Sequence, residues 1–133
     1  MAVYRHPNPG DLLICDFTTG FKKPEMVKKR PVVVISPRPR RSTQLCIIVP
    51  LSTSAPNPRM PYHYLLEDDS LPDYYRKNEN WAKCDMLYTV ALERLDRIKI
   101  RDSNGKRQYI SYRITANDLA AIQQSVLHGL GIN

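Results

Sequence analysis

Residues 29–36 read Lys-Arg-Pro-Val-Val-Val-Ile-Ser, and this stretch decides the fold class. Its four consecutive β-branched residues favour a strand, and the lack of polar alternation predicts burial on both faces. Similar apolar runs lie at residues 12–17 and 45–51. Pro50 within the last run predicts an edge position or a bulge, because proline cannot donate to a strand ladder. The first half of the chain is therefore expected to form short strands.

The second half continues the strand pattern up to a final helix. Further strand-like segments are expected at residues 62–66, 81–88, 90–95, 98–100 and 108–112. The segment 90–95 could instead form a helical turn, and Asp102-Ser-Asn-Gly105 is typical of a hairpin turn. Residues 67–80 are polar and predict a surface excursion.

The C-terminus changes to a helical period. Thr115 and Asp118 resemble a capping box with Asp in place of Glu, and Gly129 and Gly131 supply stop signals. An apolar stripe at spacings of three and four runs through Leu119, Ile122, Val126 and Leu130. The pattern predicts one domain over residues 1–133, mainly β with a C-terminal helix, built as a small antiparallel barrel.

Composition indicates an anionic partner. The 20 Lys and Arg residues outnumber the 13 Asp and Glu residues and give a net charge of +7. A surplus of this size on a small domain favours nucleic acid, although general solubility explains it equally well.

Cysteine use argues against a metal site. Cys15, Cys46 and Cys84 are widely spaced within apolar runs, where a thiol behaves as a small buried hydrophobe. No Cys/His spacing suggests zinc, and no apolar run reaches membrane-spanning length. We therefore expect a soluble protein of a reducing compartment, the cytoplasm, with no metal and no other cofactor.

Four pieces of sequence occur in a recognisable order. They are Gly10-Asp11-Leu12 with Asp16-Phe17, the stretch 29–36, Val49-Pro-Leu-Ser-Thr53 and Lys83-Cys-Asp85. Together they resemble the MazF/PemK toxins of type II toxin–antitoxin pairs. The resemblance implies an SH3-like barrel, usually a homodimer, that cleaves single-stranded RNA and is silenced by a cognate antitoxin. The loop after Phe17 and the length of residues 66–80 depart from the family pattern.

The resemblance also implies site residues. Arg30 falls at the position of the family's motif arginine, and its planar, permanently charged guanidinium suits a phosphoryl group. Ser52 stands where the family usually has threonine, and its hydroxyl could donate to a phosphoryl oxygen or relay a proton. Arg30, Ser52 and Asp85 are the predicted catalytic residues. The simpler interpretations are that Arg30 is a surface arginine at the start of a strand and that Ser52 is a turn serine.

Residues around these three are predicted to bind RNA. The predicted RNA contacts are Lys28, Lys29, Thr53 and Lys83. Strand alternation would put Lys83 and Asp85 on one face. Lys83 could then hold a phosphate and Asp85 could act as the base or orient it, or the residues could serve in a cross-strand ion pair. His63 has a suitable pKa for a base, but no motif places it in the site. Trp81 could stack a base or anchor the core.

Two consecutive basic loops could line a groove for RNA. They hold eight of the 20 basic residues: Lys22, Lys23, Lys28, Lys29, Arg30, Arg38, Arg40 and Arg41. Two other functions remain open: a CcdB-like toxin that binds DNA gyrase without cutting, and a non-enzymatic SH3-like module that binds nucleic acid.

Overall fold

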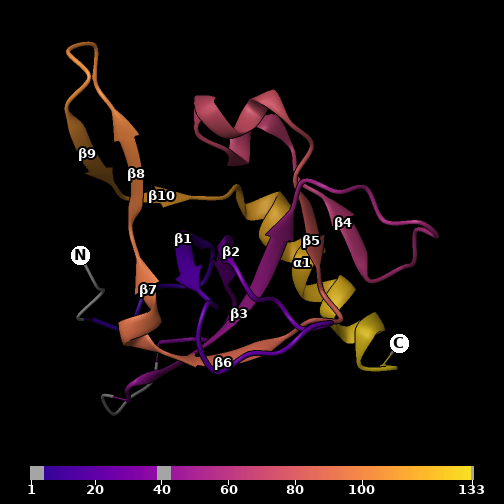
Figure 1. Ribbon diagram of the computed structural model, residues 1–133. Coiled ribbons are helices and arrows are strands. Elements are labelled where there is room, and N and C mark those ends of the chain that lie inside the picture. Colours follow the sequence, from indigo (N-terminus) through magenta and orange to yellow (C-terminus); the bar gives the residue numbers. More distant parts are fainter. Residues whose placement is uncertain (1–4, 39–42, 133) are drawn as a thin grey trace.

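The computed structural model describes residues 5–38 and 43–132. Most elements are short strands, and one long helix follows them (Figure 1). The strands are β1 (Asp11–Asp16), β2 (Lys29–Val34), β3 (Leu45–Ser52), β4 (His63–Leu65), β5 (Trp81–Lys83), β6 (Tyr88–Ala91), β7 (Leu95–Asp96), β8 (Ile98–Arg101), β9 (Arg107–Ile110) and β10 (Tyr112–Arg113). The helices are the short 3₁₀ turns η1 (Asp68–Ser70), η2 (Asp73–Lys77) and η3 (Leu92–Arg94), and the α-helix α1 (Ala116–Gly129).

Strand β2 lies at the centre of the sheet and is buried on both faces, as predicted. Val32, Val33 and Val34 are each fully buried. Val33 joins one hydrophobic cluster, and its two neighbours join the other. Because successive side chains point to opposite faces, an unbroken valine run is what a strand between two cores requires.

The main sheet curls into a half-barrel. Its strand order is β10-β1-β2-β3-β5-β4, with β6 paired to β3 and β7 paired to β1. The stretch β6–η3–β7 is continuous in sequence, so it runs from β3 back to β1 and closes the curl around one cluster. The other cluster lies between the sheet and α1. The predicted fold class, mainly β with a C-terminal helix, is confirmed (Figure 1).

Pro50 does not lie on an edge strand, so the edge position expected for it is wrong. It pairs with Val32 inside β3, which has partners on both sides. On the side away from β2, β3 pairs with β6 up to Ile48 and with β5 from Leu51. Pro50 therefore falls where one partner replaces the other, and its missing N–H interrupts no continuous ladder.

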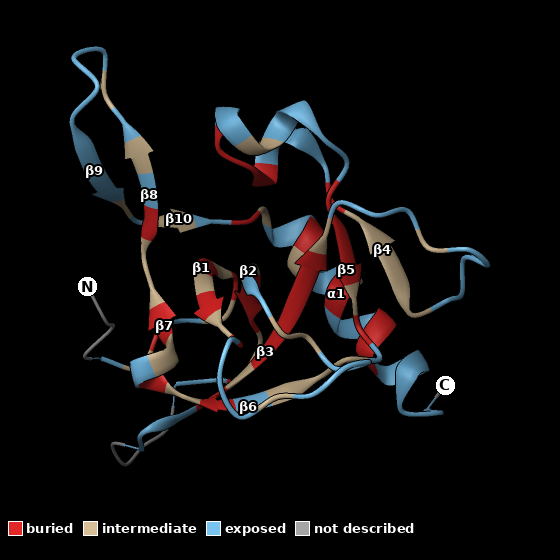
Figure 2. Cartoon of the chain, in the orientation of Figure 1, coloured by how far each residue is buried: buried red, intermediate tan, exposed pale blue. Residues whose placement is uncertain are grey.

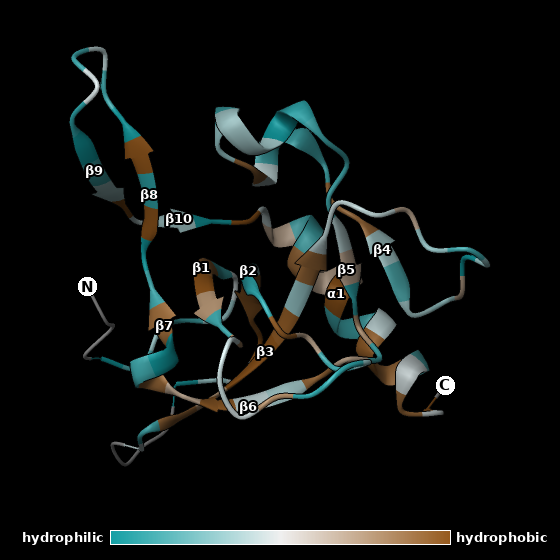
Figure 3. Cartoon of the chain, viewed as in Figure 1, coloured by the Kyte–Doolittle hydropathy of each residue, from teal (hydrophilic) through white to brown (hydrophobic). Residues whose placement is uncertain are grey.

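Two other expectations need correction. Residues 81–88 do not form one strand, because β5 ends at Lys83 and a turn precedes β6. In residues 90–95, the helical alternative is right for the middle, where η3 follows β6. The excursion at 67–80 contains η1 and η2, and it buries Ser70 and Leu71 although most of it is polar (Figures 2 and 3).

Helix α1 begins as predicted at Thr115, whose side chain accepts a hydrogen bond from the Asp118 N–H at 3.1 Å. Asp118 does not complete a capping box. Its carboxylate is fully buried and accepts from the Tyr64 hydroxyl, the Ser70 hydroxyl and the Glu67 N–H. The Thr115 N–H donates to Ser70 instead. One carboxylate thus joins α1, β4 and η1.

The predicted stripe of α1 is buried only in its middle. Ile122 and Val126 are buried, Leu119 is half-buried, and Leu130 is 58% exposed. The helix ends at Gly129, and Gly131 follows with a positive φ of 76°. No helix of the described ranges is long and apolar enough to cross a membrane.

The predicted hairpin is present and stands apart from the half-barrel. Strands β8 and β9 pair only with each other and project beside the η1–η2 excursion (Figure 1). Gly105 at the turn has a φ of 77°, and the Asp102 carboxylate accepts from the Asn104 and Lys106 N–H groups. These bonds explain why this tetrapeptide turns the chain.

Candidate active site

Arg30, Ser52 and Trp81 form a row across three neighbouring strands. Ser52 on β3 pairs directly with Trp81 on β5. The register of β2 and β3 pairs Val32 with Pro50, so two residues back it sets Arg30 opposite Ser52. Residues paired across strands share a face of the sheet. The three side chains therefore lie on one face, and two of them, Arg30 and Ser52, are predicted site residues.

Both ends of this row carry unsatisfied donors. Within the described residues, the buried side-chain nitrogen and oxygen atoms without a hydrogen-bond partner are Arg30 Nε and Trp81 Nε1. A buried donor without a partner is costly, and such donors are rare in folded proteins. Two such donors in one row could both donate to an acceptor from a ligand, such as a phosphoryl oxygen. The Arg59 guanidinium lies 4.9 Å from the centroid of the Trp81 ring and covers it.

Ser52 lies between the two donors with its hydroxyl proton available. Its Oγ accepts a hydrogen bond from the Ser54 N–H at 3.2 Å, which holds the side chain in place. Accepting leaves the O–H free to donate. Thr53 follows β3 and is exposed, so its hydroxyl also faces water.

His63 lies beside the row, although no sequence motif placed it there. It pairs with Lys83 across β4 and β5. Strand alternation puts Lys83 on the same face of β5 as Trp81. Lys83 is half-buried, and it makes no ion pair within the part of the chain that the structure describes, so the ion-pair reading of Lys83 is not supported. The pairing of β4 with β5 brings His63 to the site, and no local pattern shows that pairing.

Hydrogen bonding fixes the tautomer of His63. Its Nδ1 accepts from the Met60 N–H at 3.0 Å, so in the neutral ring the proton is on Nε2. Desolvation, followed by the Lys83 charge, lowers the pKa of His63, while the Asp85 charge acts in the opposite direction. At neutral pH the ring is uncharged and presents Nε2–H as a donor.

Asp85 reaches this area by a different route from the predicted one. It lies in the turn after β5 rather than on the strand, so alternation does not place it. The Asp85 charge still acts on His63 and raises the pKa of that ring. The end of α1 packs on this turn: a Cβ at Gly129 would lie 3.2 Å from the Asp85 Cα, so only glycine fits without a shift.

Lys28 and Lys29, both predicted to bind RNA, lie just before β2 and at its first position. Lys28 and Lys29 are both exposed. Lys29 alternates with Arg30, so it points to the other face, where it pairs with Asp16 and lines a cavity of about 280 Å³. Two hydrogen bonds from Thr18, and more weakly the Lys29 charge, lower the pKa of Asp16. Of the basic turn, only Arg38 is described, and it is exposed; Arg40 and Arg41 lie outside the described residues.

The loop between β1 and β2 packs closely on the half-barrel. Phe17, Phe21 and Tyr88 form an aromatic cluster with ring centroids 5.1–5.5 Å apart. Arg94 lies over the Phe21 ring and donates to the Asp16 and Thr19 carbonyl oxygens. These contacts hold the loop, so the chain enters β2 and Arg30 from a fixed direction.

The cysteines and acidic residues suggest no further chemistry. Cys15, Cys46 and Cys84 are buried free thiols, as predicted, and burial raises the pKa of Cys15 and of Cys84 to about 12. Such thiols stay protonated and are poor nucleophiles. Across residues 5–38 and 43–132, no group of three or more His, Cys, Asp or Glu side chains is arranged to hold a metal ion.

Two curated bacterial proteins are similar in sequence. The YifN protein of Escherichia coli K12 is 28% identical, and the alignment covers 98% of this chain and 95% of that protein. A protein of Haemophilus influenzae is 30% identical over 71% of this chain and 73% of its own length.

Solved structures of similar fold include endoribonucleases. MazF of Deinococcus radiodurans gives a TM-score of 0.67 at 18% identity, covering 97% of this chain and all of the other. A mycobacterial endoribonuclease in complex with its cognate antitoxin gives 0.65 at 19% identity, covering 96% and 97%. At this identity they show a shared fold.

Family membership follows from the sequence model. The model of the PemK-like, MazF-like toxin of type II toxin–antitoxin systems matches residues 8–126, which include the whole Arg30–Ser52–Trp81 row. The chain therefore belongs to the PemK-like, MazF-like toxin family of type II toxin–antitoxin systems.

Proposed function

We propose that this toxin is an endoribonuclease that cuts single-stranded RNA, with messenger RNA in the cytoplasm as its target, and uses no metal ion. The observation that carries the proposal is the row of Arg30, Ser52 and Trp81. Its two buried donors lack partners among the described residues, and its central hydroxyl proton is free. A phosphodiester supplies the acceptors that these donors need.

The reaction is an attack within the substrate. A base takes the proton of the ribose 2′-OH, the 2′-oxygen bonds to phosphorus, and the bond from phosphorus to the 5′-oxygen breaks. The departing 5′-oxygen takes a proton, which leaves a 2′,3′-cyclic phosphate and a 5′-hydroxyl. DNA lacks the 2′-OH and cannot follow this route.

Each site residue has a part in this scheme. Arg30 stabilises the charge that develops on the phosphoryl oxygens, because its guanidinium is preorganised and always charged. Ser52 donates its free proton to a phosphoryl oxygen or to the leaving group. Asp85 is the proposed base, or orients the base. Lys83, half-buried and without an ion pair among the described residues, holds a phosphate.

Other contacts would bind the RNA without reacting. Thr53 follows Ser52 in the chain and is exposed, so its hydroxyl can donate to the RNA. Lys28 and Lys29 are exposed cations on the segment that enters β2. Since Lys29 points away from Arg30, its contact would be to RNA that has already passed the row.

The partners of the toxin follow from its family. The solved structures include a mycobacterial endoribonuclease in complex with its cognate antitoxin, and a MazE–MazF complex of Deinococcus radiodurans. We expect this chain to act as a homodimer and to be silenced by an antitoxin whose acidic, disordered segment folds across Arg30. Such a segment would compete with RNA, because both are anionic.

The decisive experiment is incubation with a long single-stranded RNA in EDTA, followed by mapping of both new ends. We expect cyclic phosphate and 5′-hydroxyl ends, and an intact DNA of the same sequence. Folded Arg30→Ala protein is the control for contaminating nuclease. Activity that disappears in EDTA and returns with magnesium would refute the metal-free reaction. A chain that cuts no RNA but binds DNA gyrase would support the CcdB-like alternative.

A further inference from the structure

One cavity of the described residues lies outside the Arg30 row. It measures about 770 Å³ and opens between the β8–β9 hairpin and the η1–η2 excursion. Its floor is apolar, formed by Ile100, Ile110 and Pro72. This volume falls within the range of small-molecule sites, and it could receive a nucleobase with its sugar.

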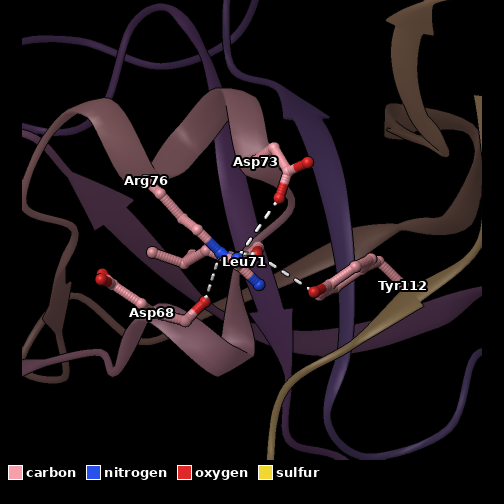
Figure 4. A network of polar contacts seen from close by, with 5 residues as sticks. All are labelled: Asp68, Leu71, Asp73, Arg76 and Tyr112. Carbon is pink, nitrogen blue, oxygen red and sulfur yellow. Dashed lines mark hydrogen bonds and ion pairs between the residues drawn. The ribbon is translucent and has the colours of Figure 1, made fainter.

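A network of polar contacts holds one wall of the cavity in place (Figure 4). The Tyr112 hydroxyl of β10 donates to the Leu71 carbonyl oxygen at 3.0 Å. Arg76 Nε donates to that oxygen and to the Asp68 carbonyl oxygen, each at 2.9 Å. Its guanidinium also pairs with Asp73 at 3.3 Å. The excursion is therefore tied to the sheet before any ligand arrives.

The hairpin also contributes basic residues to the lining. Lys99, Arg101 and Arg107 line the cavity, and Arg101 pairs with Arg107 across the hairpin. The carboxylate among the lining residues, Asp73, already pairs with Arg76. Two like charges directly opposite each other destabilise a hairpin unless an anion lies between them. Arg101 donates to the Gly105 carbonyl oxygen at 3.2 Å, and among the described residues Lys99, Arg101 and Arg107 form no ion pair. Their positive charge is therefore available to an anionic ligand.

An exposed aromatic ring completes the site. Tyr74 lines the cavity and is 68% exposed, the largest exposed fraction among the big hydrophobic side chains described. Lys77 lies 5.2 Å from its ring centroid, and Tyr75 packs against its edge. A ring fixed at the mouth of a basic cavity suits base stacking, because every nucleobase has a flat π face.

We propose that this cavity is a second binding site for single-stranded RNA, which holds the substrate beyond the cleavage point. The inference rests on the proposed ribonuclease function. Tyr74 stacks a base over the apolar floor, and Arg101 and Arg107 bind the adjoining phosphates. An acidic peptide would match the charge, but it would leave the floor and the ring without a flat partner.

The position of the cavity also favours the substrate. Lys99 lines both this cavity and the smaller one of about 280 Å³, which Lys29 lines as well. Lys29 is the chain neighbour of Arg30. An RNA strand that leaves Arg30 and passes the first residue of β2 therefore meets Lys29 and then Lys99. Arg101 and Arg107 follow in the cavity. Lys29, which points away from the catalytic row, would bind the RNA along this path.

The test measures binding of a fluorescent 2′-O-methyl oligouridylate, which cannot undergo 2′-OH attack, in a short and a long form. Tyr74→Ala should weaken binding of the long form by roughly tenfold, as loss of a stacked base predicts. Arg107→Glu should reduce the slope of log affinity against log salt by about 0.7 for each phosphate that the variant no longer binds. Neither change should affect the short form, which spans only the Arg30 row.

Lys106→Glu is the matched control, because it reverses the same charge on the same hairpin outside the cavity lining. It should change binding much less than Arg107→Glu. Unchanged affinity for the long form in both cavity variants would overturn the proposal. It would also be overturned if both variants bound an acidic antitoxin peptide more weakly but bound the long RNA as the wild type does. A wild-type chain that cuts no RNA, yet binds the long form through Tyr74 and Arg107, would refute the ribonuclease and keep this site.

Discussion

The two faces of the curled sheet differ in whether their buried polar groups are hydrogen-bonded. On the face covered by α1, the buried Asp118 carboxylate accepts three hydrogen bonds, from Tyr64, Ser70 and Glu67. On the face of the Arg30–Ser52–Trp81 row, the buried Arg30 Nε and Trp81 Nε1 have no partner among the residues that the structure describes.

This contrast separates stability from function. A satisfied buried network stabilises one arrangement of elements, whereas an unsatisfied donor lowers stability until a ligand supplies its partner. Substitutions on the helix face should therefore reduce stability and spare chemistry. Substitutions in the row should do the reverse.

The largest effect is expected at Arg30. Arg30→Ala should slow RNA cleavage on the order of 10²–10³, as loss of a preorganised donor to an oxyanion does. Its stability should hardly fall, because the Nε removed has no hydrogen-bond partner within the described ranges. Cleavage rates and urea unfolding of the same preparation check both halves. A folded variant that cuts near the wild-type rate would remove Arg30 from the site.

The next effect is expected on the other face, at Asp118. Asp118→Asn should lower the free energy of unfolding by about 2–3 kcal/mol, because an amide nitrogen then faces a buried donor. Cleavage per folded molecule should stay the same. The exposed neighbour Asn117, which donates to Glu67, provides the control Asn117→Ala, with a loss below about 0.5 kcal/mol. Equal losses in the two variants would show that the buried network is not what joins the elements.

A smaller effect is expected at Ser52. Ser52→Ala should slow cleavage roughly tenfold, the equivalent of about 1.4 kcal/mol, if the hydroxyl donates to the phosphate. Ser52→Thr keeps the hydroxyl and should retain activity. Single-turnover rates on one RNA compare the three proteins. An alanine variant as fast as the threonine variant would assign Ser52 to the turn alone, where its Oγ accepts from Ser54.

The smallest effect concerns His63 and pH. Desolvation and the Lys83 charge lower the pKa of His63 below its ordinary 6.5, so folding favours the neutral ring. Its contribution is complete above that value, and stability falls as the pH drops from 6.5 toward the folded pKa. Gln can accept from Met60 and donate as the neutral ring does, so His63→Gln should remove this part of the pH dependence. Urea midpoints of both proteins across this range should diverge at the acidic end; parallel curves would contradict the assignment.

Much of the fold could be predicted because its signals are local. The valine run of β2, the Asp102–Gly105 turn and the Thr115 cap each depend on residues close in the chain. Arg30 and Ser52 were predicted from the motifs that carry the family resemblance, and those motifs need no knowledge of pairing. The edge position predicted for Pro50 was wrong because its surroundings are not local. The sheet accepts a proline there because β6 and β5, two strands far along the chain, replace one another as partners of β3.

By itself, the sequence determined most of the strands, the helix, the family resemblance and the arginine proposed for the site. Tertiary structure decided which residues stand beside that arginine. Trp81 joins the row through strand register, and His63 enters through the pairing of β4 with β5. The cavity at Tyr74 exists because the excursion and the hairpin meet. The physical reason is that short apolar strands carry no mark of their partners, and register is set only when all of them pack around common cores.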